Sequence, residues 1–126
     1  MELVHGLKNW NKFSRVGYFN TIQISCSFHI PGRTEPLRPF GYILRPSRKA
    51  ILAIYYKDVC SYTIGGLKKV SKENDIFKCG IGDLEFLTPL GKHNEIIVDS
   101  RFIEIVGYYG NHKKFNLACK NYLGGK

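Results

Sequence analysis

The chain has 126 residues, of which 44% are apolar, and it carries a formal net charge of +9. This length fits a single globular domain over residues 1–126, and no apolar run approaches the roughly 18 residues that span a membrane. The first residues, MELVHGLKNWNKF, place charged residues and asparagine among apolar ones, unlike the core of a signal peptide. We therefore expect an intracellular protein, cytoplasmic or nuclear, with neither a signal peptide nor a transmembrane segment.

The positive charge is concentrated in the first half of the chain. Residues 1–57 hold nine basic residues against two acidic ones, a net +7, whereas residues 58–126 hold ten against eight, a net +2. Such asymmetry favours attraction to a polyanion, either nucleic acid or an anionic membrane surface. A protein can also carry this charge without a specific partner.

The first two segments with a repeating pattern differ in their period. Leu3, Leu7 and Trp10 recur at helical spacing, so a short helix is expected over residues 2–13, although a glycine interrupts it. The next segment, NTIQISCSFHI at residues 20–30, alternates apolar and polar residues. This alternation predicts a strand with one buried face and one exposed face.

Residues 31–49, PGRTEPLRPFGYILRPSRK, contain four of the five prolines and four arginines. Proline fixes φ and disfavours helix in the preceding residue, so we expect an extended, semi-rigid loop that projects its arginines. Two roles fit this loop. As a contact arm, it would stack Phe40 and Tyr42 on unpaired bases beside the guanidinium groups. As a structural cap over the open end of a barrel, it would bury Phe40 and Ile43 in the core.

The rest of the chain reads as short strands separated by turns. AILAIYY at residues 50–56 is apolar on both faces, which predicts a strand in the middle of a sheet, paired with residues 59–64. Residues 67–75 fit either a turn of helix or an exposed loop. Further strands are predicted at residues 76–79, 84–88, 95–99, 102–108 and 115–119.

These elements predict an all-β fold, a mainly antiparallel β-sandwich or β-barrel with at most one or two short helices. The residues expected to face the core are Ile22, Ile24, Phe28, Ile51, Ile54, Ile97, Ile103 and Ile105.

The sequence contains no motif of a catalytic site, so we expect a protein that is not an enzyme and that has no cofactor and no metal. The four histidines lack the spacing of metal ligands. The cysteines contain no C-x-x-C pair and are expected to be free, buried thiols: Cys26, Cys60, Cys79 and Cys119. Five acidic residues alternate along neighbouring predicted strands, which leaves a metal-dependent nuclease as one alternative. These acids are Asp83, Glu85, Glu95, Asp99 and Glu104.

Two stretches resemble parts of known families. IIVDSRFIEIVGYYGN at residues 96–111 resembles the strand and glycine–aromatic–glycine turn near the end of jacalin-type lectin domains, although the chain lacks their amino-terminal Gly-Gly sugar loop. The resemblance implies a carbohydrate-binding module that uses Tyr108, Tyr109 and Asn111 beside Asp99. The alternating strand followed by GRTEPLRPF is similar to the start of the core in matrix proteins of negative-strand RNA viruses.

The favoured hypothesis is a non-enzymatic basic protein that binds RNA or DNA. Such a protein would belong to a homo-oligomer or to a larger assembly, such as a viral particle or a ribonucleoprotein. The alternatives are the jacalin-like carbohydrate-binding module and the nuclease. Contact is expected from the Pro/Arg loop and from lysines that the fold brings beside it. The candidate nucleic-acid-binding residues are Arg33, Arg38, Phe40, Tyr42, Arg45, Arg48, Lys49, Lys68, Lys69, Lys113 and Lys114.

Overall fold

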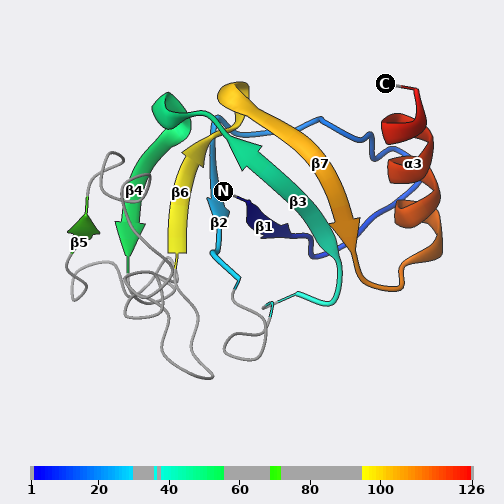
Figure 1. Ribbon diagram of the computed structural model, residues 1–126. Coiled ribbons are helices and arrows are strands. Elements are labelled where there is room, and N and C mark those ends of the chain that lie inside the picture. The colour runs from blue at the N-terminus through cyan, green and yellow to red at the C-terminus, as the bar shows by residue number, and fades with distance from the viewer. Residues whose placement is uncertain (1, 30–35, 37, 56–68, 72–94, 126) are drawn as a thin grey trace.

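Two antiparallel sheets and one α-helix make up the part of the chain that the computed structural model describes, residues 2–29, 36, 38–55, 69–71 and 95–125 (Figure 1). The three-stranded sheet has the order β1-β3-β7, with β1 at Leu3–Gly6, β3 at Gly41–Pro46 and β7 at Ile103–Tyr109. The four-stranded sheet has the order β2-β6-β4-β5, with β2 at Gln23–Cys26, β6 at Glu95–Asp99, β4 at Ile51–Tyr55 and β5 at Lys69–Ser71. The helix α3 spans Lys113–Gly124. The all-β prediction is confirmed.

The two sheets are joined at several places. Val4 in β1 and Ser27 after β2 exchange two backbone hydrogen bonds of 2.9 Å, so an edge strand of each sheet meets the other. Two 3₁₀ turns, η1 (Arg48–Ala50) and η3 (Ser100–Phe102), carry the chain from β3 to β4 and from β6 to β7. In Figure 1 the strands therefore form one curved layer, with α3 beside β7.

Alternation along the strands places apolar side chains on the inner face. In β2, Ile24 and Cys26 are buried while Gln23 and Ser25 are exposed, as the sequence pattern predicts. The inner faces of both sheets and of α3 contribute to one core. Its buried members are Leu3, Ile24, Cys26, Phe40, Tyr42, Leu44, Ala50, Ile51, Ile96, Val98, Ile105, Phe115 and Cys119.

Phe115 of α3 lies at the centre of an aromatic cluster. Its ring centroid lies 5.1 Å from Trp10, 5.1 Å from Phe40, 5.2 Å from Tyr42 and 6.4 Å from Tyr108. These partners come from the loop after β1, from β3 with the residue before it, and from β7. A single helical side chain therefore attaches α3 to three separate segments of the chain.

Two predicted elements are wrong. Residues 3–6 of the expected helix over residues 2–13 form β1, because the register of β1 against β3 pairs Leu3 with Leu44 and buries both. The strand expected at residues 115–119 lies within α3, because Phe115 and Cys119 are one helical turn apart and are buried on the same face.

The remaining core and strand predictions divide into three groups. Ile24, Ile51 and Ile105 are buried; Phe28, Ile97 and Ile103 are partly buried; and Ile22 is wrong, because 53% of its surface is exposed just before β2 begins. The side chain of Ile54 and the strands expected at residues 59–64, 76–79 and 84–88 lie outside the described residues. Residues 69–71, within the stretch expected to be a helical turn or an exposed loop, form β5.

Cys26 and Cys119 are free and buried, and Cys60 and Cys79 lie outside the described residues. Among the described residues, no helix has the length and the apolar character that crossing a membrane would require.

Candidate nucleic-acid interface

The middle of the Pro/Arg segment is a strand and not the extended loop that the sequence predicts for residues 31–49. Residues 41–46 form β3, which lies between β1 and β7 and pairs with both. This strand is compatible with the prolines because Pro39 precedes it and Pro46 ends it, so no proline interrupts the hydrogen bonds of its interior. The neighbouring Arg33 lies outside the described residues.

β3 separates the predicted arginines into two groups. Arg38 is exposed at the end where β3 begins, and its aliphatic part lies against Gly6, where an added Cβ would come within 2.6 Å of it. Arg45, Arg48 and Lys49 lie at the other end, roughly 17 Å away at about 3.3 Å per residue.

The second group has partners of its own. Arg45 forms an exposed ion pair of 3.0 Å with Glu2, and the Lys49 ammonium lies 4.0 Å from the centre of the Phe102 ring. Arg48 is exposed beside them in η1 and has a contact of its own. These cations are satisfied locally, and Figure 1 places η1 far from α3.

The rings of Phe40 and Tyr42 are core residues, so the stacking role predicted for them does not fit this structure. Phe40 packs against Phe115 and the ring of His112, whose centroid is 4.6 Å away, and Tyr42 packs against Phe115 and Phe19. Burial raises the pKa of Tyr42 to about 12. The burial of Phe40 agrees with the second role that the sequence allowed for the Pro/Arg loop, in which Phe40 lies in the core.

Two aromatic rings that the sequence analysis did not select are exposed instead. Phe13 and Tyr18, in the loop between β1 and β2, have 83% and 61% of their surfaces in contact with solvent. Each ring carries a neighbouring cation: the Lys12 ammonium lies 5.0 Å from the centre of Phe13, and the Arg15 guanidinium lies 5.5 Å from the centre of Tyr18. The signal in the sequence is NKFSRVGYF, which interleaves basic and aromatic residues without the period of a helix or a strand.

Tertiary contacts hold this loop beside α3. Trp10 packs edge-on against Phe115 in the first half of the helix, and the backbone of Gly17 hydrogen-bonds the Tyr42 hydroxyl. A turn places Tyr18, because the Tyr18 N–H donates to the Arg15 carbonyl at 3.1 Å and Gly17 has φ +85°. Glycine tolerates this φ at the third position of a type II turn.

The helix α3 adds three lysines and no acid. Lys113 and Lys114 stand in its first turn, Lys120 follows two turns later, and all three are exposed. Its amino-terminal end is capped by His112, whose Nδ1 accepts from the Phe115 N–H at 3.2 Å. The amino-terminal end of a helix carries a partial positive charge from the helix dipole. The positive side chains at this end add to that charge, so the potential there attracts anions.

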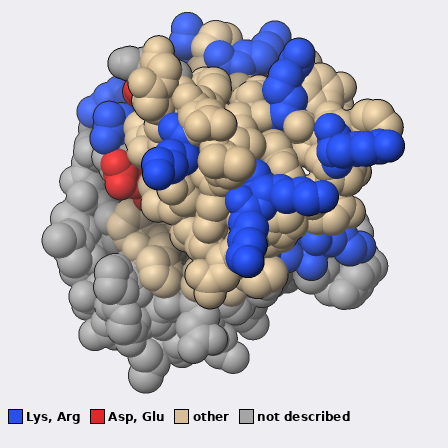
Figure 2. Space-filling view, turned by 90° about the vertical axis from the view of Figure 1, so that its right-hand side faces the viewer, with Lys and Arg blue, Asp and Glu red and all other residues tan. Residues whose placement is uncertain are grey.

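These segments form what we call the basic face. Figure 2 views the side of the molecule that carries α3 and shows Lys and Arg side chains spread across it, with acidic atoms only near one edge of the view. Arg38 lies at the end of β7 that leads into α3, where the Tyr109 hydroxyl donates to its carbonyl at 3.3 Å. We use the name basic face for the exposed cations of the loop after β1, of the residues just before β3 and of α3: Lys8, Lys12, Arg15, Arg38, Lys113, Lys114 and Lys120.

Acidic residues do not neutralise this face within the described part of the chain. Glu95 and Asp99 are buried, Glu2 pairs with Arg45, and Glu104 lies near the carboxyl end of α3, where it lines a small hollow with Tyr122. The structure therefore gathers Arg38, Lys113 and Lys114 of the predicted set, and adds four cations that the prediction omitted. Lys69 lies in β5 at the opposite edge of the fold, and Lys68 is outside the described residues.

The lectin-like arrangement is not assembled. Asp99 ends β6 and pairs with Arg101 at 2.7 Å, whereas Tyr108 and Tyr109 end β7, at the opposite end of that strand. The hydrogen bond from Arg101 holds the pKa of the Asp99 carboxyl below its ordinary value. Among the described residues, no three His, Cys, Asp or Glu side chains are grouped as metal ligands, and Asp83 and Glu85 lie outside that part.

Comparison of the chain with protein-family models, with curated proteins and with solved structures found no match.

Proposed function

We propose that the protein binds single-stranded nucleic acid through its basic face, as a non-enzymatic component of a nucleoprotein assembly. The observation that carries this proposal is the convergence of seven exposed cations with the two exposed rings of Phe13 and Tyr18. Cations neutralise phosphates without regard to sequence, and exposed rings stack on unpaired bases. A single strand uses both features, whereas a duplex, whose bases are already stacked on one another, uses only the cations.

The same features favour nucleic acid over an anionic membrane surface. A helix that lies in a membrane interface presents a continuous apolar face to the lipid. The outward face of α3 offers only Leu117, 60% exposed, between lysines, and a cation lies over each of the rings of Phe13 and Tyr18. Isolated rings beside charges suit stacking better than insertion into lipid.

The test is the salt dependence of binding to a fluorescein-labelled 20-residue oligo(dT), measured by fluorescence anisotropy. The face variant replaces Lys12, Arg15 and Lys113 by Gln, and the matched control replaces Arg45, Arg48 and Lys49 by Gln. Both lose three positive charges, but only the first loses them from the basic face. The slope of log K against log[salt] should flatten by about 2 in the face variant, at roughly 0.7 per phosphate contact in a single strand.

The outcomes separate the possibilities. The proposal predicts little change of slope in the control variant; equal flattening in both variants would mean that only total charge matters and would contradict it. Phe13→Ala should weaken binding by about 1–3 kcal/mol at every salt concentration, because stacking depends little on ions. Binding to phosphatidylserine vesicles without binding to oligo(dT) would assign the basic face to a membrane and refute the proposal.

A further inference from the structure

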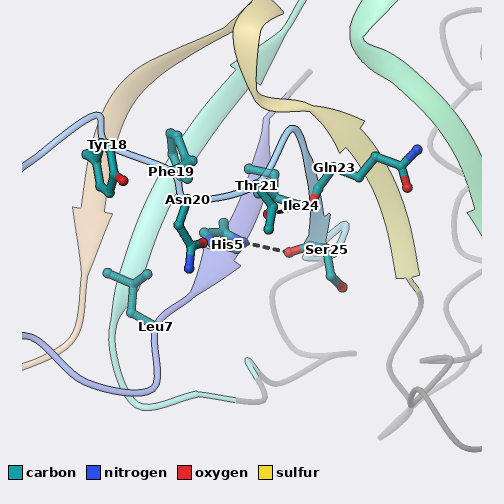
Figure 3. Close-up of a pocket in the computed structure, with 9 residues that line it drawn as sticks. All are labelled: His5, Leu7, Tyr18, Phe19, Asn20, Thr21, Gln23, Ile24 and Ser25. Carbon is teal, nitrogen blue, oxygen red and sulfur yellow. Dashed lines mark hydrogen bonds between the residues drawn. The ribbon is translucent and has the colours of Figure 1, made fainter.

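A pocket opens next to the basic face, between β1, β2 and the segment that leads into β2. Its volume is about 380 Å³, within the range of about 300–1,000 Å³ that small-molecule sites occupy. Figure 3 shows its lining side chains, among them His5, Leu7, Tyr18, Phe19, Asn20 and Gln23. Among the described residues, no Lys, Arg, Asp or Glu lines it. The lining that the structure describes is therefore polar but carries no fixed charge, in contrast to the surface beside it.

His5 supplies a hydrogen-bond acceptor in this pocket. Its Nδ1 lies 2.6 Å from the Ser25 carbonyl oxygen, and because a carbonyl only accepts, Nδ1 carries the proton in this contact. Burial holds the pKa of His5 below its ordinary value, so the ring is neutral near pH 7. In that tautomer Nε2 has no proton and accepts.

The other walls suit a flat ring with polar edges. Tyr18 lines the pocket and is also one of the two exposed rings. The Arg15 guanidinium lies 5.5 Å from the centre of its ring. Leu7 and Phe19 add apolar surface, and the amide of Asn20, an exposed residue, offers a donor and an acceptor. In Figure 3 the Gln23 side chain points away from these residues.

We propose that this pocket receives one base of the bound strand, with its hydrogen-bonding edge toward His5 and Asn20 and its face against Tyr18. The inference rests on the proposed function. When Arg15 holds a phosphate, the base of that nucleotide or of the next nucleotide lies beside Tyr18, which is three residues from Arg15 in the protein sequence. A base of a single strand enters such a pocket without the cost of opening a duplex. The pocket accepts any of the four bases, because each carries an N–H donor on its pairing edge.

The experiment compares three ten-residue strands of equal charge by anisotropy: oligo(dT), oligo(N3-methyl-dT) and an abasic deoxyribose-phosphate strand. N3-methylation removes the donor and keeps the ring, so oligo(N3-methyl-dT) should bind roughly 5-fold more weakly than oligo(dT). The abasic strand loses stacking as well and should bind a further roughly 5- to 150-fold more weakly than oligo(N3-methyl-dT). The pocket variant is Asn20→Ala, and the control is Asn121→Ala, an exposed amide on α3 away from the pocket.

The inference expects the pocket variant to reduce the preference for oligo(dT) over both other strands, while Asn121→Ala leaves it unchanged. The His5 imidazole ¹⁵N resonances should also move on addition of oligo(dT) and not of the abasic strand. If methylation and the pocket variant have no effect while the salt slope persists, base contact comes from Phe13, and the pocket inference is wrong although the proposed function stands. If no strand binds, the proposed function fails and the inference with it.

Discussion

Replacement of Phe115 by alanine should be among the most destabilising substitutions in the chain. Phe115 has no exposed surface and contacts the rings of Trp10, Phe40, Tyr42 and Tyr108 at centroid distances of 5.1–6.4 Å. Deletion of a buried phenylalanine ring costs about 3–5 kcal/mol, and each aromatic pair adds about 0.5–1.5 kcal/mol beyond buried area. We therefore expect Phe115→Ala to cost about 4 kcal/mol of unfolding free energy, a large share of the roughly 5–15 kcal/mol that stabilises a domain.

The assay is urea unfolding, followed by circular dichroism and by the fluorescence of the single tryptophan, Trp10, which packs on Phe115. Phe115→Leu keeps much of the apolar surface and should cost roughly half as much, so it serves if Phe115→Ala does not fold. Leu117→Ala is the control, because it lies two residues along the same helix but is exposed and should change stability by less than about 0.5 kcal/mol. A Phe115→Ala variant as stable as Leu117→Ala would refute the idea that this ring attaches α3 to the sheet.

Three further predictions concern backbone, thiols and pH. Gly110 has φ +99° and an added Cβ would lie 2.3 Å from the Pro39 carbonyl oxygen, so Gly110→Ala should lower the free energy of unfolding by at least about 2 kcal/mol in urea. Burial raises the pKa of Cys26, and of Cys119 to about 11, so neither thiol should react with Ellman's reagent until the protein is denatured, and no reductant should be needed; reaction of Cys26 or Cys119 in the native state, located by mass spectrometry of the labelled peptides, would contradict the burial. The pKa of Tyr42 is raised to about 12, so the unfolded chain releases the Tyr42 proton at a lower pH than the folded protein does. The contribution of Tyr42 to stability is therefore complete below about pH 10 and is lost as the pH rises toward about 12. In urea titrations, Tyr42→Phe should show a shallower alkaline loss of stability than the parent.

Strands with a clear period were predictable because burial of one face imposes alternation that is visible locally. This holds for Ile24 and Cys26 in β2, whereas β6 and β7 were predictable from their β-branched residues. The wrong helix at residues 2–13 and the wrong strand at residues 115–119 fall on short segments in which both periods are present. Leu3, Leu7 and Trp10 have helical spacing, but pairing with β3 decides the conformation of residues 3–6.

The helix α3 was missed although its period was present in the sequence. Phe115, Cys119 and Tyr122 recur at i, i+4 and i+7, and Tyr122 lay beyond the short window that reads as a strand. The capping residue also did not indicate the start of a helix, because His112 occupies the N-cap position, where Ser, Thr, Asp or Asn is usual.

The candidate site was only partly predictable, because exposure of an aromatic ring depends on residues far away in the sequence. Phe40 is buried because it meets Phe115, and Phe13 is exposed because the loop that carries it is attached to the core through Trp10 instead. Neither outcome has a local signature. Arg38 was predicted to contact nucleic acid because it lies in the proline-rich segment. Its place on the basic face results instead from the neighbouring turn between β7 and α3.

We propose that the α3 side of the molecule contacts the nucleic-acid strand. Titration of the ¹⁵N-labelled protein with oligo(dT), monitored by the amide chemical shifts, tests this contact most directly. We expect the largest shifts at residues 8–18 and 113–120, with residues 45–49 and β4 essentially unmoved. Largest shifts at residues 45–49, with α3 unchanged, would contradict it and would return the contact surface to the arginines at the far end of β3.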